Sequence, residues 1–168
     1  METMGTTETI VRHRDEGSAT WAFNGLATTK ASRGETGGAF ALVEHLLSPA
    51  ANPPMHVHGD EEESFYVLDG EIEFEVDGAL VHARPGSFLL APRGSEHRFR
   101  VLTETARMLV LVSAPGGEPR GGVTGLFEAV GEPARARVLP EPSAPDPAAV
   151  AAVAAACGIE LTGPPAAS

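Results

Sequence analysis

Apolar and polar residues alternate along much of the chain between residues 40 and 112. In the segment 71–76, Ile72, Phe74 and Val76 share one face of an extended strand, and three glutamates share the other. A period of two is typical of a β-strand with one face in a core and one in water. The same pattern predicts further strands over 21–30, 40–47, 63–68, 79–84 and 107–112.

Short turn signals separate these strands. Asp69-Gly70 and Asp77-Gly78 are dipeptides that suit two-residue hairpin loops, and Pro85-Gly86 closes a third turn. Hairpins join antiparallel strands, so the pattern predicts an all-β fold of antiparallel strands.

Two helices are predicted beyond the strands. Thr124 begins a short helix that runs through Val130. A second helix is predicted over 147–157, with Asp146 as its N-cap and Gly158 as its C-cap. We expect it to pack on the outside of the sheets or on a partner.

Length and composition are consistent with one folded domain. The 168 residues include 19 glycines and 14 prolines, which suit many short strands joined by tight turns. We divide the chain into a polar N-terminal arm (1–20), a β-barrel (21–114) and a C-terminal extension (115–168) that contains a proline-rich linker and the helix 147–157.

Charge and cysteine content exclude several kinds of function. A formal net charge of −11 argues against a nucleic-acid partner and an anionic membrane surface. The single cysteine, Cys157, leaves no internal disulfide. The N-terminus has no apolar signal segment, so we expect a cytoplasmic protein.

Three histidines and one glutamate form a candidate metal site. His56 and His58 lie two residues apart, so on a strand both side chains leave from one face. Glu63 and His97 each lie on the face of their strand that carries apolar residues. A buried carboxylate needs neutralisation, which a metal provides, and three imidazoles with one carboxylate suit a divalent transition metal.

Two further glutamates, Glu62 and Glu96, are candidates for roles at the same site. Glu62 is the nearest rival of Glu63, but the strand phase favours Glu63. Glu96 or a backbone carbonyl could orient the His97 ring, although sequence adjacency places Glu96 on the opposite face. The remaining histidines have no partner at ligand spacing and are interpreted as structural or surface residues: His13, His45 and His82.

The spacing of these residues resembles that of the cupins. Their first motif, H-x-H, four residues, E, six residues, G, is matched by His56, His58, Glu63 and Gly70. Their second motif is matched at Gly86, Pro92, Gly94 and His97. This chain departs from the motif at Val101, where the family usually has an asparagine. The resemblance covers roughly residues 39–112.

The resemblance implies a jelly-roll barrel, that is, an antiparallel double-stranded β-helix, here with a short C-terminal helical extension. It also implies four metal ligands, His56, His58, Glu63 and His97, around one divalent transition metal: iron, manganese, nickel, copper or zinc. A small-molecule substrate and a homodimer are further expectations from the family.

For function, the resemblance points to metal-dependent dioxygenases similar to quercetinase, which act on small aromatic, flavonol-like or β-dicarbonyl compounds. Glu63 would then also act as the catalytic base. A zinc cyclase or isomerase of polyketide metabolism and a non-enzymatic small-molecule-binding cupin remain as alternatives. The side chains expected to line the substrate pocket are Phe65, Val67, Phe74 and Phe99.

Overall fold

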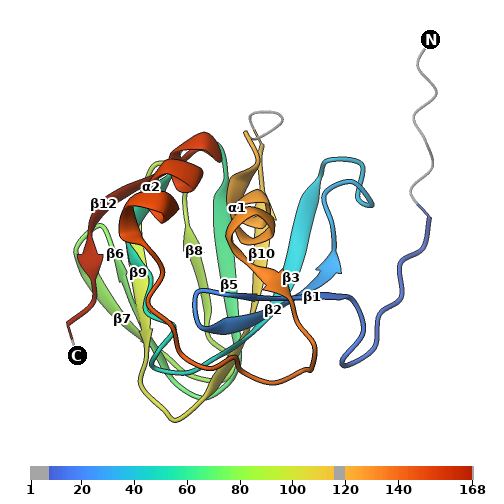
Figure 1. The fold of residues 1–168 in the computed structure, drawn as a ribbon, viewed down its shortest axis with the longest axis horizontal. Helices are drawn as coiled ribbons and strands as arrows, with labels where there is room; N and C mark the ends of the chain where they lie inside the picture. The colour runs from blue at the N-terminus through green and yellow to red at the C-terminus, as the bar shows by residue number, and fades with distance from the viewer. Residues whose placement is uncertain (1–7, 116–119, 168) are drawn as a thin grey trace.

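Two antiparallel sheets pack face to face in the computed structural model of the chain, which describes residues 8–115 and 120–167 (Figure 1). The larger sheet has seven strands, in the spatial order β11 (Glu132–Pro133), β1 (Ser18–Ala22), β2 (Gly25–Ala31), β3 (Phe40–Leu47), β10 (Ala106–Ser113), β5 (Glu62–Asp69) and β8 (Phe88–Ala91). The smaller sheet has five, in the order β12 (Ile159–Pro165), β4 (Pro54–His58), β9 (Glu96–Val101), β6 (Ile72–Val76) and β7 (Ala79–Ala83). The predicted antiparallel barrel is confirmed.

The alternation read from the sequence produces the core between the sheets. Ile72 and Phe74 of β6 are 0% and 1% exposed, while Glu73 and Glu75 pair on the outer face with arginines of β9. Phe65 of β5 packs against Phe74 with 5.0 Å between ring centroids. The buried faces of the two sheets thus form one apolar layer, as in other face-to-face sheet packings.

Segment 21–30, predicted as one strand, instead contains the turn of a hairpin, with the end of β1 before it and most of β2 after it. β1 and β2 are joined at Phe23-Asn24, where both residues have positive φ, 50° and 60°. These angles suit a two-residue hairpin loop, although neither loop residue is a glycine and Gly25 lies one position after the loop. The Asn24 side chain bonds to the backbone at Ala50 and Ser143, so tertiary contacts hold this turn.

Strand β12 was not predicted from the sequence. It pairs antiparallel with β4, placing Ile159 opposite His58 and Leu161 opposite His56. Its second half contains Gly163, Pro164 and Pro165, which argue against a strand in a sequence but are tolerated at a sheet edge. β12 is an edge strand of the five-stranded sheet.

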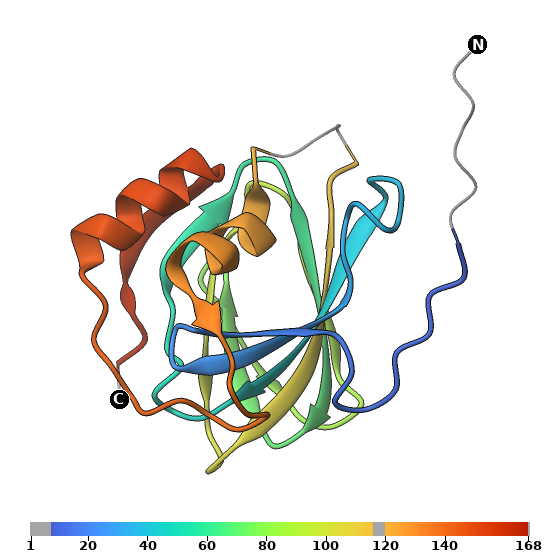
Figure 2. The same ribbon diagram turned by 45° about the vertical axis from the view of Figure 1, so that its right-hand side comes forward.

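Both predicted helices are present. α1 (Gly122–Val130) begins two residues before Thr124, and α2 (Pro147–Ala156) begins after Asp146, whose side chain accepts a hydrogen bond from the Ala148 amide. α1 packs over the space between the sheets, and α2 lies farther out beside β12 (Figure 2). No described helix combines the length and apolar character needed to cross a bilayer.

Candidate metal centre

The four candidate ligands meet in the interior between the two sheets. The smaller sheet supplies the imidazoles, with His56 and His58 on β4 and His97 on β9, and the larger sheet supplies Glu63 from β5. His56 and His97 are direct cross-strand partners. One ligand atom from each of the four side chains lies within 4.8 Å of the others. The arrangement could therefore hold a metal ion.

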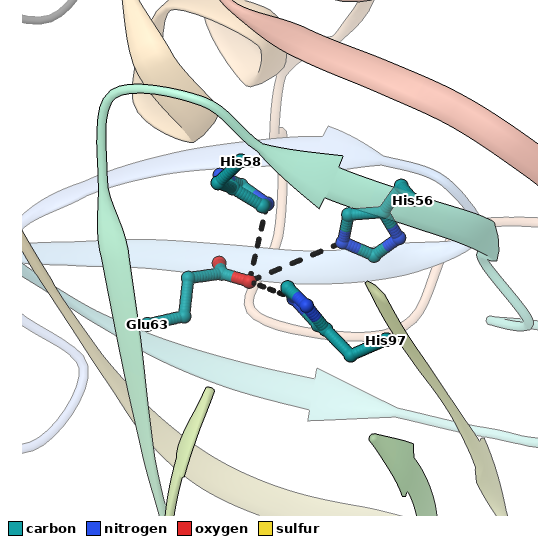
Figure 3. A group of neighbouring side chains, drawn as sticks. All are labelled: His56, His58, Glu63 and His97. Carbon is teal, nitrogen blue, oxygen red and sulfur yellow. Dashed lines mark hydrogen bonds and ion pairs between the residues drawn. The ribbon is translucent and has the colours of Figure 1, made fainter. Parts of the chain in front are cut away.

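One carboxylate oxygen is the centre of this cluster (Figure 3). Glu63 Oε2 lies 2.9 Å from His97 Nε2, 3.2 Å from His58 Nε2 and 4.0 Å from His56 Nε2. All three imidazoles present the same type of nitrogen to it. Convergent Nε2 atoms around one oxygen are the arrangement expected of a site for a cation.

Backbone carbonyls orient two of the imidazoles. The Nδ1 atom of His56 donates to the Pro54 carbonyl at 2.8 Å, and that of His97 donates to the Ser95 carbonyl at 3.1 Å. A proton held on Nδ1 leaves the Nε2 lone pair of a neutral imidazole free to ligate. For His97 the backbone, and not Glu96, provides this contact.

Burial sets the electrostatics of the cluster. His58, Glu63 and His97 are at most 5% exposed. Burial by itself raises the pKa of Glu63, but its interactions with His58 and His97 outweigh this and hold the pKa well below its usual value. Glu63 is therefore ionised at neutral pH, as a metal ligand must be.

The pKa values of His58 and His56 are shifted in opposite directions. Burial by itself lowers the pKa of His58, but the carboxylates of Glu63 and Glu61 outweigh it and raise the pKa to about 10. Burial, with a contribution from His97, lowers the pKa of His56 to about 4. Without a metal, His58 therefore carries the positive charge that compensates Glu63.

The buried nitrogens of His58 fit a metal better than they fit the surrounding protein. Its Nδ1 and Nε2 make no well-formed hydrogen bond within the described residues, although carboxylate oxygens lie 3.5 Å and 3.2 Å away. Buried polar atoms without such a bond are costly. A metal ion bonded to Nε2 would satisfy that atom and replace the positive charge.

Glu61 is a site residue that the sequence reasoning missed. Its side chain is 2% exposed, and it lies 3.5 Å from His58 Nδ1, 3.1 Å from Arg33 and 2.8 Å from the Val123 amide at the start of α1. A carboxylate behind a ligating imidazole fixes the ring and raises its basicity. Of the acidic run 60–63, the sequence pattern indicates only Glu63 as a site residue, with Glu62 as its nearest rival. In the sequence, only the i,i+3 spacing from His58 indicates a role for Glu61. Its other partners, Arg33 and α1, are far from it along the chain.

A mostly apolar cavity of about 100 Å³ surrounds the cluster. Of the predicted pocket residues, the structure places Phe65 and Phe99 in its wall, whereas Val67 and Phe74 lie in the core behind it, each 1% exposed. His45, interpreted from the sequence as structural or surface, also lines the cavity. The C-terminal extension contributes further wall residues, namely Val123, Leu126, Phe127, Val150, Ile159 and Leu161.

Comparison with known proteins agrees with the fold. The family model of the cupin domain matches residues 43–113. The chain is 31% identical over 110 residues to quercetin 2,3-dioxygenase of Bacillus subtilis, a match that covers 64% of the chain and 30% of that protein. It is 33% identical over 95 residues to polyketide synthase CurC of Streptomyces cyaneus, covering 56% of the chain and 60% of that protein. The chain thus spans less than two thirds of the length of either relative.

Solved structures show the same architecture. A predicted oxalate decarboxylase from Thermotoga maritima superposes with a TM-score of 0.57 at 18% identity, over 63% of the chain and 99% of that structure. At this identity the likeness concerns the fold alone. The family match, together with the two relatives, identifies residues 43–113 as a cupin domain.

Proposed function

We propose that the chain is a metal-dependent cupin enzyme, a dioxygenase that acts on a small aromatic, flavonol-like or β-dicarbonyl compound. The observation that carries this proposal is the convergence of three imidazole Nε2 atoms on the Glu63 carboxylate inside an apolar cavity. The likeness to quercetin 2,3-dioxygenase supports the reaction class.

The four candidate ligands restrict the metal to a few divalent transition metals. Three imidazoles and one carboxylate suit iron, manganese, nickel, copper or zinc, and selection among them depends on supply as well as affinity. When bound, such a metal would supply Lewis acidity and open positions for a substrate oxygen.

Glu63 has two roles in this proposal. As a ligand, its ionised carboxylate balances part of the metal charge. As a base, it would accept the acidic proton of an enol, phenol or β-dicarbonyl.

The size of the cavity favours the smaller substrates. A cavity of about 100 Å³ suits a β-dicarbonyl or a single-ring phenol better than a three-ring flavonol. Phe65 and Phe99 would contact the flat apolar part of the substrate.

A second candidate is a zinc-dependent cyclase or isomerase of polyketides. The similarity to polyketide synthase CurC favours it. The same four ligands would then polarise a carbonyl and stabilise an enolate, without consuming dioxygen. The two candidates share a site and differ in whether the metal is redox-active.

Metal analysis with oxygen uptake distinguishes the candidates. The full chain and a His58→Ala variant are produced in media that each supply one of the five metals, and their metal content is measured. Oxygen uptake is then followed with pentane-2,4-dione and with quercetin. Uptake that depends on a redox metal and is lost in His58→Ala supports the dioxygenase. Turnover of a poly-β-ketone without uptake supports the cyclase, and the absence of any turnover would leave a binding function.

The assembly and partners of the protein are also proposals. Likeness to the cupins supports a homodimer that binds a small molecule. The acidic net charge argues against nucleic acids and anionic membranes as partners. Sedimentation equilibrium of the full chain measures the oligomeric state.

A further inference from the structure

His45 lies in the cavity wall but outside the cluster of candidate ligands. It stands on β3, where its backbone neighbours across the sheet are Ala27 on β2 and Met108 on β10. The residue is 9% exposed and lines the same cavity as His58 and Glu63. It does not belong to the group of side chains whose ligand atoms converge.

The Nε2 atom of His45 has no hydrogen-bond partner among the described residues. This atom is also sealed from solvent. The ring packs instead against Phe127 of α1, with 5.3 Å between centroids and an angle of 58° between the planes. Ala27 and Met108 beside it are apolar. Because a buried polar atom without a partner is unfavourable, packing alone would favour an apolar residue at this position.

The imidazole is neutral inside the fold. Burial lowers the pKa of His45 to about 4, although the charge of Glu63 acts in the opposite direction. A neutral imidazole offers one N–H donor and one acceptor nitrogen, so it can pair with either kind of group. Aside from the four candidate ligands, His45 is the titratable side chain among the described residues of this wall.

We propose that His45 is the second polar anchor of the cavity and hydrogen-bonds a polar atom of the substrate away from the candidate metal centre. This inference rests on the proposed function and deepens it. The substrate class is then a small molecule with two separated polar ends, one oxygen directed at the ligand cluster and a carbonyl, hydroxyl or similar group directed at His45. A flat apolar body between them packs against Phe99 and Phe127.

A pair of probes that differ only at the remote end tests this assignment. The full chain, loaded with zinc, is titrated with 4-nitrocatechol and with catechol, and the Kd is measured by visible absorption or calorimetry. Both probes offer the same oxygens to a metal, but only the nitro compound has an acceptor at the far end. His45→Phe keeps the ring and its packing and removes the polar atoms.

We expect His45→Phe to weaken 4-nitrocatechol by roughly 3- to 10-fold, the effect of one hydrogen bond, and to change catechol by less than about 2-fold. His45→Gln, which retains a donor and an acceptor, should recover part of the loss. Equal weakening of both probes, or no weakening of either, would overturn the assignment.

Two further readouts separate this inference from the proposed function. Zinc content of the wild type reports on the metal centre alone. In the metal-free protein, the ¹⁵N resonances of the His45 ring report on the anchor alone when 4-nitrocatechol is added. A zinc-free wild type whose His45 resonances shift would refute the metal centre and retain the anchor. Resonances that stay unchanged at saturating probe, or a wild type that binds neither probe, would refute the anchor.

Discussion

Glu61 and His45 are polar residues with no counterpart in the ligand motif, and both are buried against the cavity or the ligands. The Glu61 carboxylate contacts three groups: the His58 ring, the Arg33 guanidinium and the Val123 amide of α1. Its burial is therefore supported electrostatically, whereas that of His45 is not. The contrast assigns Glu61 to positioning a ligand and His45 to contact with a substrate.

Glu61→Gln is expected to weaken metal binding by roughly 10- to 100-fold, the usual cost of removing a carboxylate behind a ligating imidazole. The amide keeps the shape but not the charge that raises the basicity of His58. A competitive titration with a chromophoric chelator measures the affinity, and circular dichroism checks the fold. Glu62→Gln, one residue away on the outer face of β5, is the matched control and should bind metal as the wild type does.

The neutral state of His45 predicts a dependence of stability on pH. In the unfolded chain the imidazole titrates near 6.5, and in the folded chain its pKa is about 4. Between these values the unfolded state binds more protons, so stability falls as the pH is lowered from about 6.5 toward 4 and is unaffected by this group above that range. Between pH 7 and pH 5 the metal-free wild type should lose about 2 kcal/mol more than His45→Phe in urea denaturation. An equal loss in both proteins would show that His45 is not held neutral.

At the scale of elements, the C-terminal extension completes the site from two directions. β12 pairs with β4 and so holds the strand that carries His56 and His58. The N-terminus of α1 binds the Glu61 carboxylate, because the Val123 amide donates a hydrogen bond to it at 2.8 Å. The positive end of a helix dipole favours a carboxylate at this position. Residues after 120 thus contribute to ligand geometry without supplying a ligand.

Gly122→Ala tests the contact between α1 and Glu61. Gly122 has φ +62°, and a Cβ there would lie 2.0 Å from Glu61 Oε1, so the carboxylate must move. We expect a loss of stability together with metal binding weakened by about 10-fold, as for other changes to the support of a ligand. Gly78→Ala is the control, because Gly78 has φ +82° with no atom within 4 Å of an added Cβ. It should cost about 1–2 kcal/mol of stability for the left-handed backbone and leave metal affinity unchanged.

At the scale of the whole molecule, the cluster joins the two sheets. In the metal-free protein the links are the contacts of Glu63 with His58, at 3.2 Å, and with His97, at 2.9 Å. A divalent ion bonded to both sheets would replace the proton on His58 and bind the folded chain in preference to the unfolded one. Metal binding should therefore appear as stability of the entire domain.

Addition of zinc to the chelator-treated protein is expected to raise its Tm. At a free concentration of 100 times Kd the gain is about 2.7 kcal/mol, which corresponds to roughly 5–10 °C for a domain of this size. Differential scanning calorimetry at several zinc concentrations measures it. His82→Ala, which changes an exposed imidazole on β7, should respond as the wild type does. His58→Ala should show almost no shift, and a full shift in that variant would contradict the role of His58.

Local patterning by itself determined β3, β5, β6, β7 and β10, the turns on either side of β6, and the phase that turns Glu63 inward and Glu62 outward. These features follow from alternation and turn residues within a few positions, which act before any tertiary contact forms. The N-cap of α2, Asp146, is read from the sequence for the same reason, whereas the C-cap is Cys157 and not the predicted Gly158. Motif spacing also indicated the four candidate metal ligands.

Tertiary structure decided what depends on contacts between distant segments. The Phe23-Asn24 turn is held by residues 50 and 143, and β12 becomes a strand because β4 offers an edge. Glu61 is buried because Arg33 and α1 neutralise it. His45 faces a cavity because Phe127 of α1 covers its ring. Burial of a polar side chain depends on partners far along the chain, and spacing within a short motif does not record them.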